Sequence, residues 1–101
     1  MTTALTSTAL NKKPVVLCVG GSDPSAHAGL QVDLRVGQDL GVHVMTVVTA
    51  LTAQNSQGVS RVSAVSSLDY QAQWQAVLDD VSPDAIKIGL LPNKALVSAT
   101  L

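Results

Sequence analysis

The chain has 101 residues, a length suited to one modest domain. Its 47% hydrophobic content excludes a disordered polar chain and predicts a compact apolar core. The net charge of −1 provides no electrostatic footprint for nucleic acid or an anionic membrane, and two aromatic residues, Tyr70 and Trp74, are too few for a base-stacking surface.

The amino end of the chain and its single cysteine indicate where in the cell we expect the protein. Residues 1–11 are rich in Thr, Ser and Ala, and Lys12 and Lys13 follow them, so we expect a flexible lead-in and not a targeting peptide. The longest apolar stretch is too short to span a bilayer. Cys18 is the only cysteine, which excludes an internal disulfide and favours a cytoplasmic location. Because it lies within the apolar run Val15–Val19, we interpret it as a small buried hydrophobe.

The first half of the chain predicts a strand, a helix and a second strand. The apolar run Pro14–Gly21 predicts a strand buried on both faces. Apolar residues at helical spacing predict a helix over Ala28–Leu40, which Gly41 would end. The β-branched run Val42–Leu51 predicts a second buried strand. This order predicts a right-handed crossover and therefore an α/β fold with a parallel βαβ-type sheet.

A polar segment follows the second predicted strand. Thr52–Gly58 predicts a loop, and spaced valines predict a short irregular strand or flap over 59–65. Ser66 and Asp69 resemble a capping box, in which a hydroxyl and a carboxylate satisfy free N–H groups at the start of a helix. We expect Pro83 to mark the end of that helix.

The carboxyl end of the chain predicts a third strand over Ala85–Leu91 and the start of a further helix over Lys94–Leu101. Three strands with two complete helices cannot cover both faces of a parallel sheet. We therefore expect residues 1–101 to be one truncated domain, the first part of a larger α/β domain. An uncovered, valine-rich edge would invite pairing with other chains, so a complete chain of this sequence would be poorly soluble.

Polar residues follow two predicted strands at their carboxyl ends. Gly20–Ser25 leads from the first strand into a helix, and Thr49–Asn55 ends the second in hydroxyl and amide groups. Open α/β proteins bind ligands at this edge of the sheet, so we predict a pocket for a small hydrogen-bonding organic molecule. The glycine-rich segment has neither the lysine and spacing of a Walker loop nor a dinucleotide fingerprint.

Three segments, in order and spacing, resemble the hydroxymethylpyrimidine/phosphomethylpyrimidine kinases of thiamine biosynthesis: Gly20–Leu34, Thr49–Val59 and Asp84–Leu91. The resemblance implies the N-terminal portion of a ribokinase-like three-layer sandwich. It also implies phosphorylation of 4-amino-5-hydroxymethyl-2-methylpyrimidine, and then of its monophosphate, with ATP and Mg²⁺. The resemblance also suggests that the protein forms a homodimer.

The resemblance further implies a pyrimidine pocket lined by Gly21, Ala28, Asp33, Thr52, Gln54 and Leu90. A glutamine amide donates and accepts together, which complements an amino group beside a ring nitrogen, so we expect Gln54 to contact the ring. Asp33 would accept a hydrogen bond from the hydroxymethyl group or order the loop. Gly21 and Ala28 would leave room for the flat ring, and Leu90 would pack against it.

This sequence departs from the family pattern at several places. Ala26 and His27 stand where the family usually has Gly-Gly, and these residues tolerate positive φ less well. Leu90 stands where methionine is common, a change that nearly conserves volume. The family's Gly-Thr-Gly-Cys anion hole and its nucleotide and Mg²⁺ residues do not occur in the 101 residues. No catalytic or metal residue is assigned, and we expect the chain alone to be catalytically inert.

Alternative interpretations remain open. Asp33 is equally compatible with a solvated helix position, and Gln54 with hydrogen bonds to the loop backbone. Lys87 fits an edge residue that reaches solvent or a carboxylate, or alternatively a phosphate-binding group. His27 is a candidate ligand contact in the loop. The competing functions are a non-catalytic pyrimidine-binding or interaction module and a pyridoxal kinase-like vitamer kinase, although the Thr-Ala-Gln-Asn segment argues against the latter.

Overall fold

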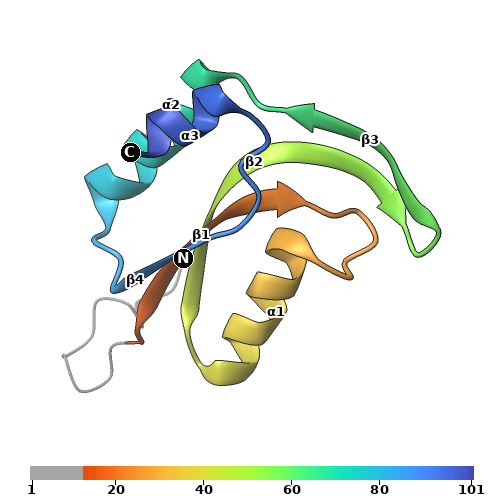
Figure 1. Cartoon of the computed structure of the whole chain (residues 1–101). Helices are drawn as coiled ribbons and strands as arrows, with labels where there is room; N and C mark the ends of the chain where they lie inside the picture. The colour runs from red at the N-terminus through yellow and green to blue at the C-terminus, as the bar shows by residue number, and fades with distance from the viewer. Residues whose placement is uncertain (1–12) are drawn as a thin grey trace.

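The computed structural model describes residues 13–101, which form one α/β unit (Figure 1). The lead-in expected over 1–11 lies outside the described residues. The elements in chain order are β1 (Val15–Ser22), α1 (Gly29–Leu40), β2 (His43–Asn55), β3 (Gly58–Ala64), α2 (Ser67–Asp80), β4 (Ala85–Ile88) and α3 (Lys94–Thr100).

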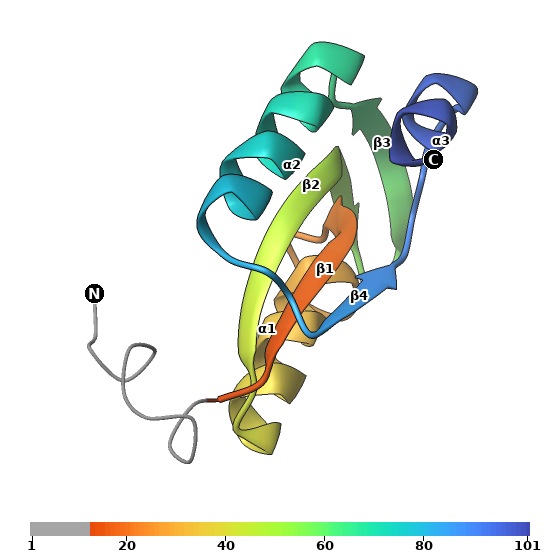
Figure 2. The same ribbon diagram turned by 90° about the vertical axis from the view of Figure 1, so that its left-hand side faces the viewer.

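The strands form one sheet in the order β3-β2-β1-β4. β1 pairs in parallel with β2 and β4, and β3 pairs antiparallel with β2. Figures 1 and 2 show α1 on one face of the sheet and α2 and α3 on the other. The predicted α/β fold and parallel strand–helix–strand unit are therefore confirmed, and the helices on both faces give three layers.

The main core lies between the sheet and the pair α2 and α3. Side chains alternate along β1, so Leu17 and Val19 point to this side and pack with Val47, Tyr70 and Leu96, all five essentially inaccessible to solvent. Tyr70 stays buried because its hydroxyl lies 2.6 Å from the Thr100 hydroxyl.

Cys18 lies on the opposite side of β1 from the main core and is buried, as predicted. Burial raises the pKa of its thiol, and the negative charge of Asp33 raises it further. This is the environment of an unreactive structural thiol.

The prediction of a loop over Thr52–Gly58 was wrong. β2 continues to Asn55 and returns as β3, a strand of seven residues, which confirms the strand alternative predicted over 59–65. Pairing between β2 and β3, as at Thr52 and Val62, gives the backbone N–H and carbonyl groups of these polar residues hydrogen-bond partners. At the turn, the Asn55 side chain accepts a hydrogen bond from the Gln57 backbone N–H at 2.8 Å. The long β2–β3 hairpin therefore depends on pairing with a distant segment, which strand periodicity alone does not reveal.

Local signals placed the ends of the helices well. The Ser66 hydroxyl accepts a hydrogen bond from the Asp69 backbone N–H at 3.0 Å, which confirms the hydroxyl half of the predicted capping box. Gly41 ends α1 with a φ of 71°. β4 stops at Ile88, three residues before the predicted end at Leu91, because the chain then turns toward α3. None of the helices in the described part of the chain is both long and apolar enough to cross a membrane.

Candidate functional site

A cavity of about 260 Å³ opens where the carboxyl ends of β1, β2 and β4 meet the start of α1. All six residues predicted to form the pyrimidine pocket line it: Gly21, Ala28, Asp33, Thr52, Gln54 and Leu90. Ser22, Asp23, Gly29, Lys87 and two further glycines complete the wall. The structure thus gathers into one hollow residues that lie up to 70 positions apart in the chain, from Gly20 to Leu90.

The loop between β1 and α1 is organised by the buried carboxylate of Asp23. Its oxygens accept hydrogen bonds from the Ser25 hydroxyl at 2.7 Å and from the Ser25 backbone N–H at 2.8 Å. They also accept from the backbone N–H groups of His27 and Ala28, at 3.1 and 3.0 Å. The Ser25 hydroxyl is the largest cause of a lowered pKa of Asp23, and the backbone donors lower it further. Asp23 therefore shapes the rim of the cavity.

Two positive φ angles shape the same loop. Ala26 has a φ of 60°, at one of the two positions where the resemblance led us to expect Gly-Gly. Gly29 has a φ of 64°, and a Cβ placed there would lie 2.4 Å from the carbonyl oxygen of Gly21. Only glycine allows this close approach of α1 to the end of β1. The exposed side chain of His27, a candidate ligand contact in the sequence, lies beside Ser25 and does not line the cavity.

Gln54 is held in place by a chain of hydrogen bonds. Its Nε2 donates to the Thr52 hydroxyl at 2.7 Å, and that hydroxyl donates to the Ser22 carbonyl at 2.8 Å. One N–H of the carboxamide is used in this way. Its second N–H and its Oε1 make no hydrogen bond within the described residues, so an acceptor and a donor remain for a ligand.

Asp33 and Lys87 form an ion pair at the cavity wall. The Lys87 Nζ lies 2.6 Å from the Asp33 Oδ1, and the two side chains are 56% and 13% exposed. The pair links α1 to β4. Its geometry confirms that Lys87 reaches a carboxylate, and it uses one of the two Asp33 oxygens.

Gly21 and Leu90 face each other across a narrow part of the cavity. A Cβ at Gly21 would lie 3.3 Å from the Leu90 Cδ2, which is tighter than ordinary van der Waals contact. The absence of a side chain at Gly21 therefore lets Leu90 pack directly against the backbone of β1 at the cavity wall.

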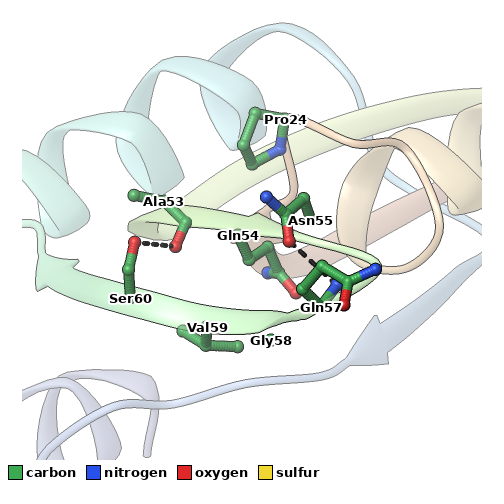
Figure 3. Close-up of a pocket in the computed structure, with 8 residues that line it drawn as sticks. All are labelled: Pro24, Ala53, Gln54, Asn55, Gln57, Gly58, Val59 and Ser60. Atoms are coloured by element: carbon green, nitrogen blue, oxygen red, sulfur yellow. Dashed lines mark hydrogen bonds between the residues drawn. The ribbon is translucent and has the colours of Figure 1, made fainter.

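A second hollow, of about 580 Å³, lies between the β2–β3 hairpin and Pro24 (Figure 3). Its lining includes Asn55, Gln57 and Ser60, and Gln54 lines both this hollow and the smaller cavity. Sequence reasoning missed it because it exists only where the hairpin lies beside the loop after β1. Because a loop was predicted over Thr52–Gly58, the hairpin that forms one wall of the hollow was not expected.

The resemblance implies Mg²⁺ and a nucleotide, and both need groups arranged to hold them. No group of three or more His, Cys, Asp or Glu side chains within 13–101 is arranged to hold a metal ion. The Gly-Thr-Gly-Cys segment is not among the 101 residues. The side chains within residues 13–101 therefore do not fit a Mg²⁺ site.

Comparison with known proteins agrees with the geometry. A family model described as Phosphomethylpyrimidine kinase matches residues 23–101. The chain is 44% identical over 84 residues to the hydroxymethylpyrimidine/phosphomethylpyrimidine kinase of Streptomyces coelicolor, covering 83% of this chain and 31% of that protein. It is 41% identical over 101 residues to the chloroplastic thiamine biosynthetic bifunctional enzyme of Arabidopsis thaliana, covering 99% of this chain and 19% of that protein. The chain therefore spans a third or less of the length of these relatives.

Solved structures show the same fold. The phosphomethylpyrimidine kinase of Clostridium difficile 630 superposes with a TM-score of 0.81 at 36% identity, covering 88% of this chain and 38% of that one. The ADP complex of Bacillus subtilis pyridoxal kinase gives a TM-score of 0.80 at 28% identity, covering 88% of this chain and 35% of that one. The neighbours are ribokinase-like kinases, as the resemblance implied. Because the family match extends over most of the chain and agrees with the fold and the gathered residues, this chain belongs to the phosphomethylpyrimidine kinase family.

Proposed function

We propose that this chain forms the aminopyrimidine-binding part of a kinase that phosphorylates 4-amino-5-hydroxymethyl-2-methylpyrimidine, and then its monophosphate, in thiamine biosynthesis. The observation that carries the proposal is the cavity at the ends of β1, β2 and β4, which is lined by all six residues expected to bind the substrate. The Gln54 carboxamide is oriented by Thr52 and retains one donor and one acceptor. An aminopyrimidine offers the complementary pair, an exocyclic amino donor beside a ring-nitrogen acceptor.

The other lining residues fit the rest of such a molecule. Gly21 and Ala28 add little bulk to the cavity wall, and Leu90 offers an apolar surface to a flat heterocycle. Asp33 keeps one carboxylate oxygen that Lys87 does not use, which suits a hydrogen bond from a hydroxymethyl group. In this proposal the chain binds and orients the acceptor alcohol.

The proposal assigns ATP and Mg²⁺ to residues outside this chain. Phosphoryl transfer needs groups that bind the phosphates and a cation that offsets the developing charge. The chain alone is therefore expected to bind the pyrimidine without phosphorylating it. Related kinases have been solved with nucleotides, including the pyridoxal kinase of Staphylococcus aureus with AMP-PCP and pyridoxal. A homodimer and a cytoplasmic location remain predictions, and one of the relatives is named as chloroplastic.

Isothermal titration calorimetry of the purified chain with hydroxymethylpyrimidine tests the proposal. We expect saturable binding that Gln54→Ala weakens at least tenfold, because the variant loses both hydrogen bonds to the ring edge. Gln75→Ala is the matched control, since Gln75 lies on α2 and bonds to Asp79. Absence of binding by the unaltered chain, or equal binding by the Gln54 variant, would contradict the proposal.

Pyridoxal is the second candidate ligand, because pyridoxal kinases share the fold with similar TM-scores. Pyridoxal has no amino group beside its ring nitrogen, so it does not present the adjacent donor and acceptor that the Gln54 carboxamide would pair with. Displacement of bound hydroxymethylpyrimidine by an equal concentration of pyridoxal would favour the pyridoxal assignment. Adding ATP and Mg²⁺ to the same sample distinguishes binding from turnover.

A further inference from the structure

Three charged side chains line the cavity: Asp23, Asp33 and Lys87. The Asp23 carboxylate is occupied by four hydrogen bonds from its own loop, so it has little capacity left for a ligand. The charge that faces a ligand is therefore that of the Asp33–Lys87 pair. Lys87 is the only cation among the residues that line the cavity.

The two members of the pair are held differently. Asp33 is on α1, only 13% exposed, and its short side chain has little freedom. Lys87 is 56% exposed, on an edge strand whose four residues are all exposed, and it has a long flexible side chain. Its ammonium carries three donors, of which the structure uses one, toward Asp33. Lys87 can therefore move its charge toward a ligand while Asp33 stays.

A neutral alcohol and a phosphomonoester place opposite demands on this cavity. The hydroxymethyl group of the first substrate needs only a hydrogen-bond acceptor. The phosphomonoester of the second carries close to two negative charges at neutral pH, which an unpaired Asp33 would repel. A cation that keeps Asp33 paired and gives its two unused donors to the phosphate reduces this repulsion.

We propose that Lys87 is a specificity-determining residue that allows one cavity to accept both the neutral pyrimidine alcohol and its phosphomonoester. With the alcohol bound, the ammonium stays on Asp33. With the phosphomonoester bound, the ammonium bridges the two anions, keeping one donor on Asp33 and giving the others to the phosphate oxygens. This inference rests on the proposed function, because it assumes that the aminopyrimidine occupies this cavity.

The test measures the dissociation constants of hydroxymethylpyrimidine and of its monophosphate for the full chain and for Lys87→Met, by titration calorimetry at one ionic strength. We expect the variant to lose at least tenfold in affinity for the monophosphate and less than threefold for the alcohol. Lys87→Arg should retain the monophosphate affinity within threefold, because it keeps the charge. Lys94→Met is the matched control at an exposed lysine on α3, outside the cavity, and should change neither constant.

The same two dissociation constants measured for Asp33→Asn provide a second test, which does not require the lysine variant to fold. Removing the anion should raise the affinity for the monophosphate relative to the alcohol, the opposite direction to Lys87→Met. Equal losses for both ligands in Lys87→Met, with an unchanged ratio in Asp33→Asn, would overturn the inference and leave the proposed function standing. So would binding of the alcohol alone by the unaltered chain. Failure of the unaltered chain to bind either ligand would overturn the proposed function, and this inference with it.

Discussion

The side chain of Gln73 on α2 pairs with both backbone polar groups of Val48 on β2. Its Oε1 accepts from the Val48 N–H at 2.7 Å, and its Nε2 donates to the Val48 carbonyl at 2.9 Å. Val48 lies just before Ala50, where β3 begins to pair, and beside an irregularity in the pairing of β1 with β2. The carboxamide thus acts as a short substitute for a neighbouring strand and ties α2 to the sheet.

Replacing Gln73 by alanine should lower the free energy of unfolding by about 1–3 kcal/mol, because the partly buried Val48 groups would lose their partner. Urea denaturation monitored by circular dichroism measures this change. Gln71→Ala is the control, since Gln71 makes only an exposed contact with Ser67 on the same helix and should change stability by less than about 0.5 kcal/mol. Equal effects of the two substitutions would contradict the role of Gln73.

Gly29→Ala should be strongly destabilising and should disrupt the cavity. The positive φ of 64° alone costs alanine about 1–2 kcal/mol, and its Cβ would also meet the Gly21 carbonyl oxygen. Gly41→Ala is a close control, with a φ of 71° and no atom within 4 Å of the added carbon. Thermal unfolding of both variants should separate the cost of the clash from that of the backbone angle. If Gly29→Ala lowers the unfolding temperature no more than Gly41→Ala does, the loop must shift to relieve the clash at little cost in stability.

Ala26→Gly should stabilise the chain by up to about 1 kcal/mol, because glycine adopts a φ of 60° without the steric penalty that alanine has there. Ala72→Gly on α2 is the opposite control and should destabilise by about 1 kcal/mol, the ordinary cost of glycine inside a helix. The denaturant concentrations at the unfolding midpoints of both variants test whether the two substitutions change stability in opposite directions. Destabilisation by Ala26→Gly would mean that chain entropy outweighs the relieved strain.

The Asp23 carboxylate should make the stability of the loop depend on pH in the acid range. Its pKa in the folded chain lies below the ordinary value of 3.8, so its contribution is fully present above that pH and is lost as pH falls through the lowered value. Unfolding free energies measured from neutral pH downward should therefore fall in this window for the unaltered chain. Asp23→Asn should be less stable at neutral pH and should show a smaller acid decline. Asp80→Asn, at an exposed carboxylate on α2, is the matched control.

Local signals were enough to predict much of the fold. Gly41 ends α1 because it alone adopts a left-handed angle there cheaply, and the Ser66 hydroxyl caps α2 through a contact three residues away. The apolar run in β1 indicated a strand covered on both faces, which the layers confirm. The six candidate site residues came from a family resemblance, and the fold places them around one cavity.

The remaining features required the tertiary structure. The polar segment from Thr52 to Asn55 is a strand only because β3 pairs with it, and the hollow beside Pro24 follows from that hairpin. Whether Lys87 would meet solvent, a carboxylate or a phosphate was open until β4 paired with β1 and placed the ammonium beside Asp33, 54 residues earlier in the chain. Sequence periodicity and capping act over a few residues and therefore determine the elements and their ends. Contacts between distant residues depend on how the elements pair and pack, so only the folded chain decided them.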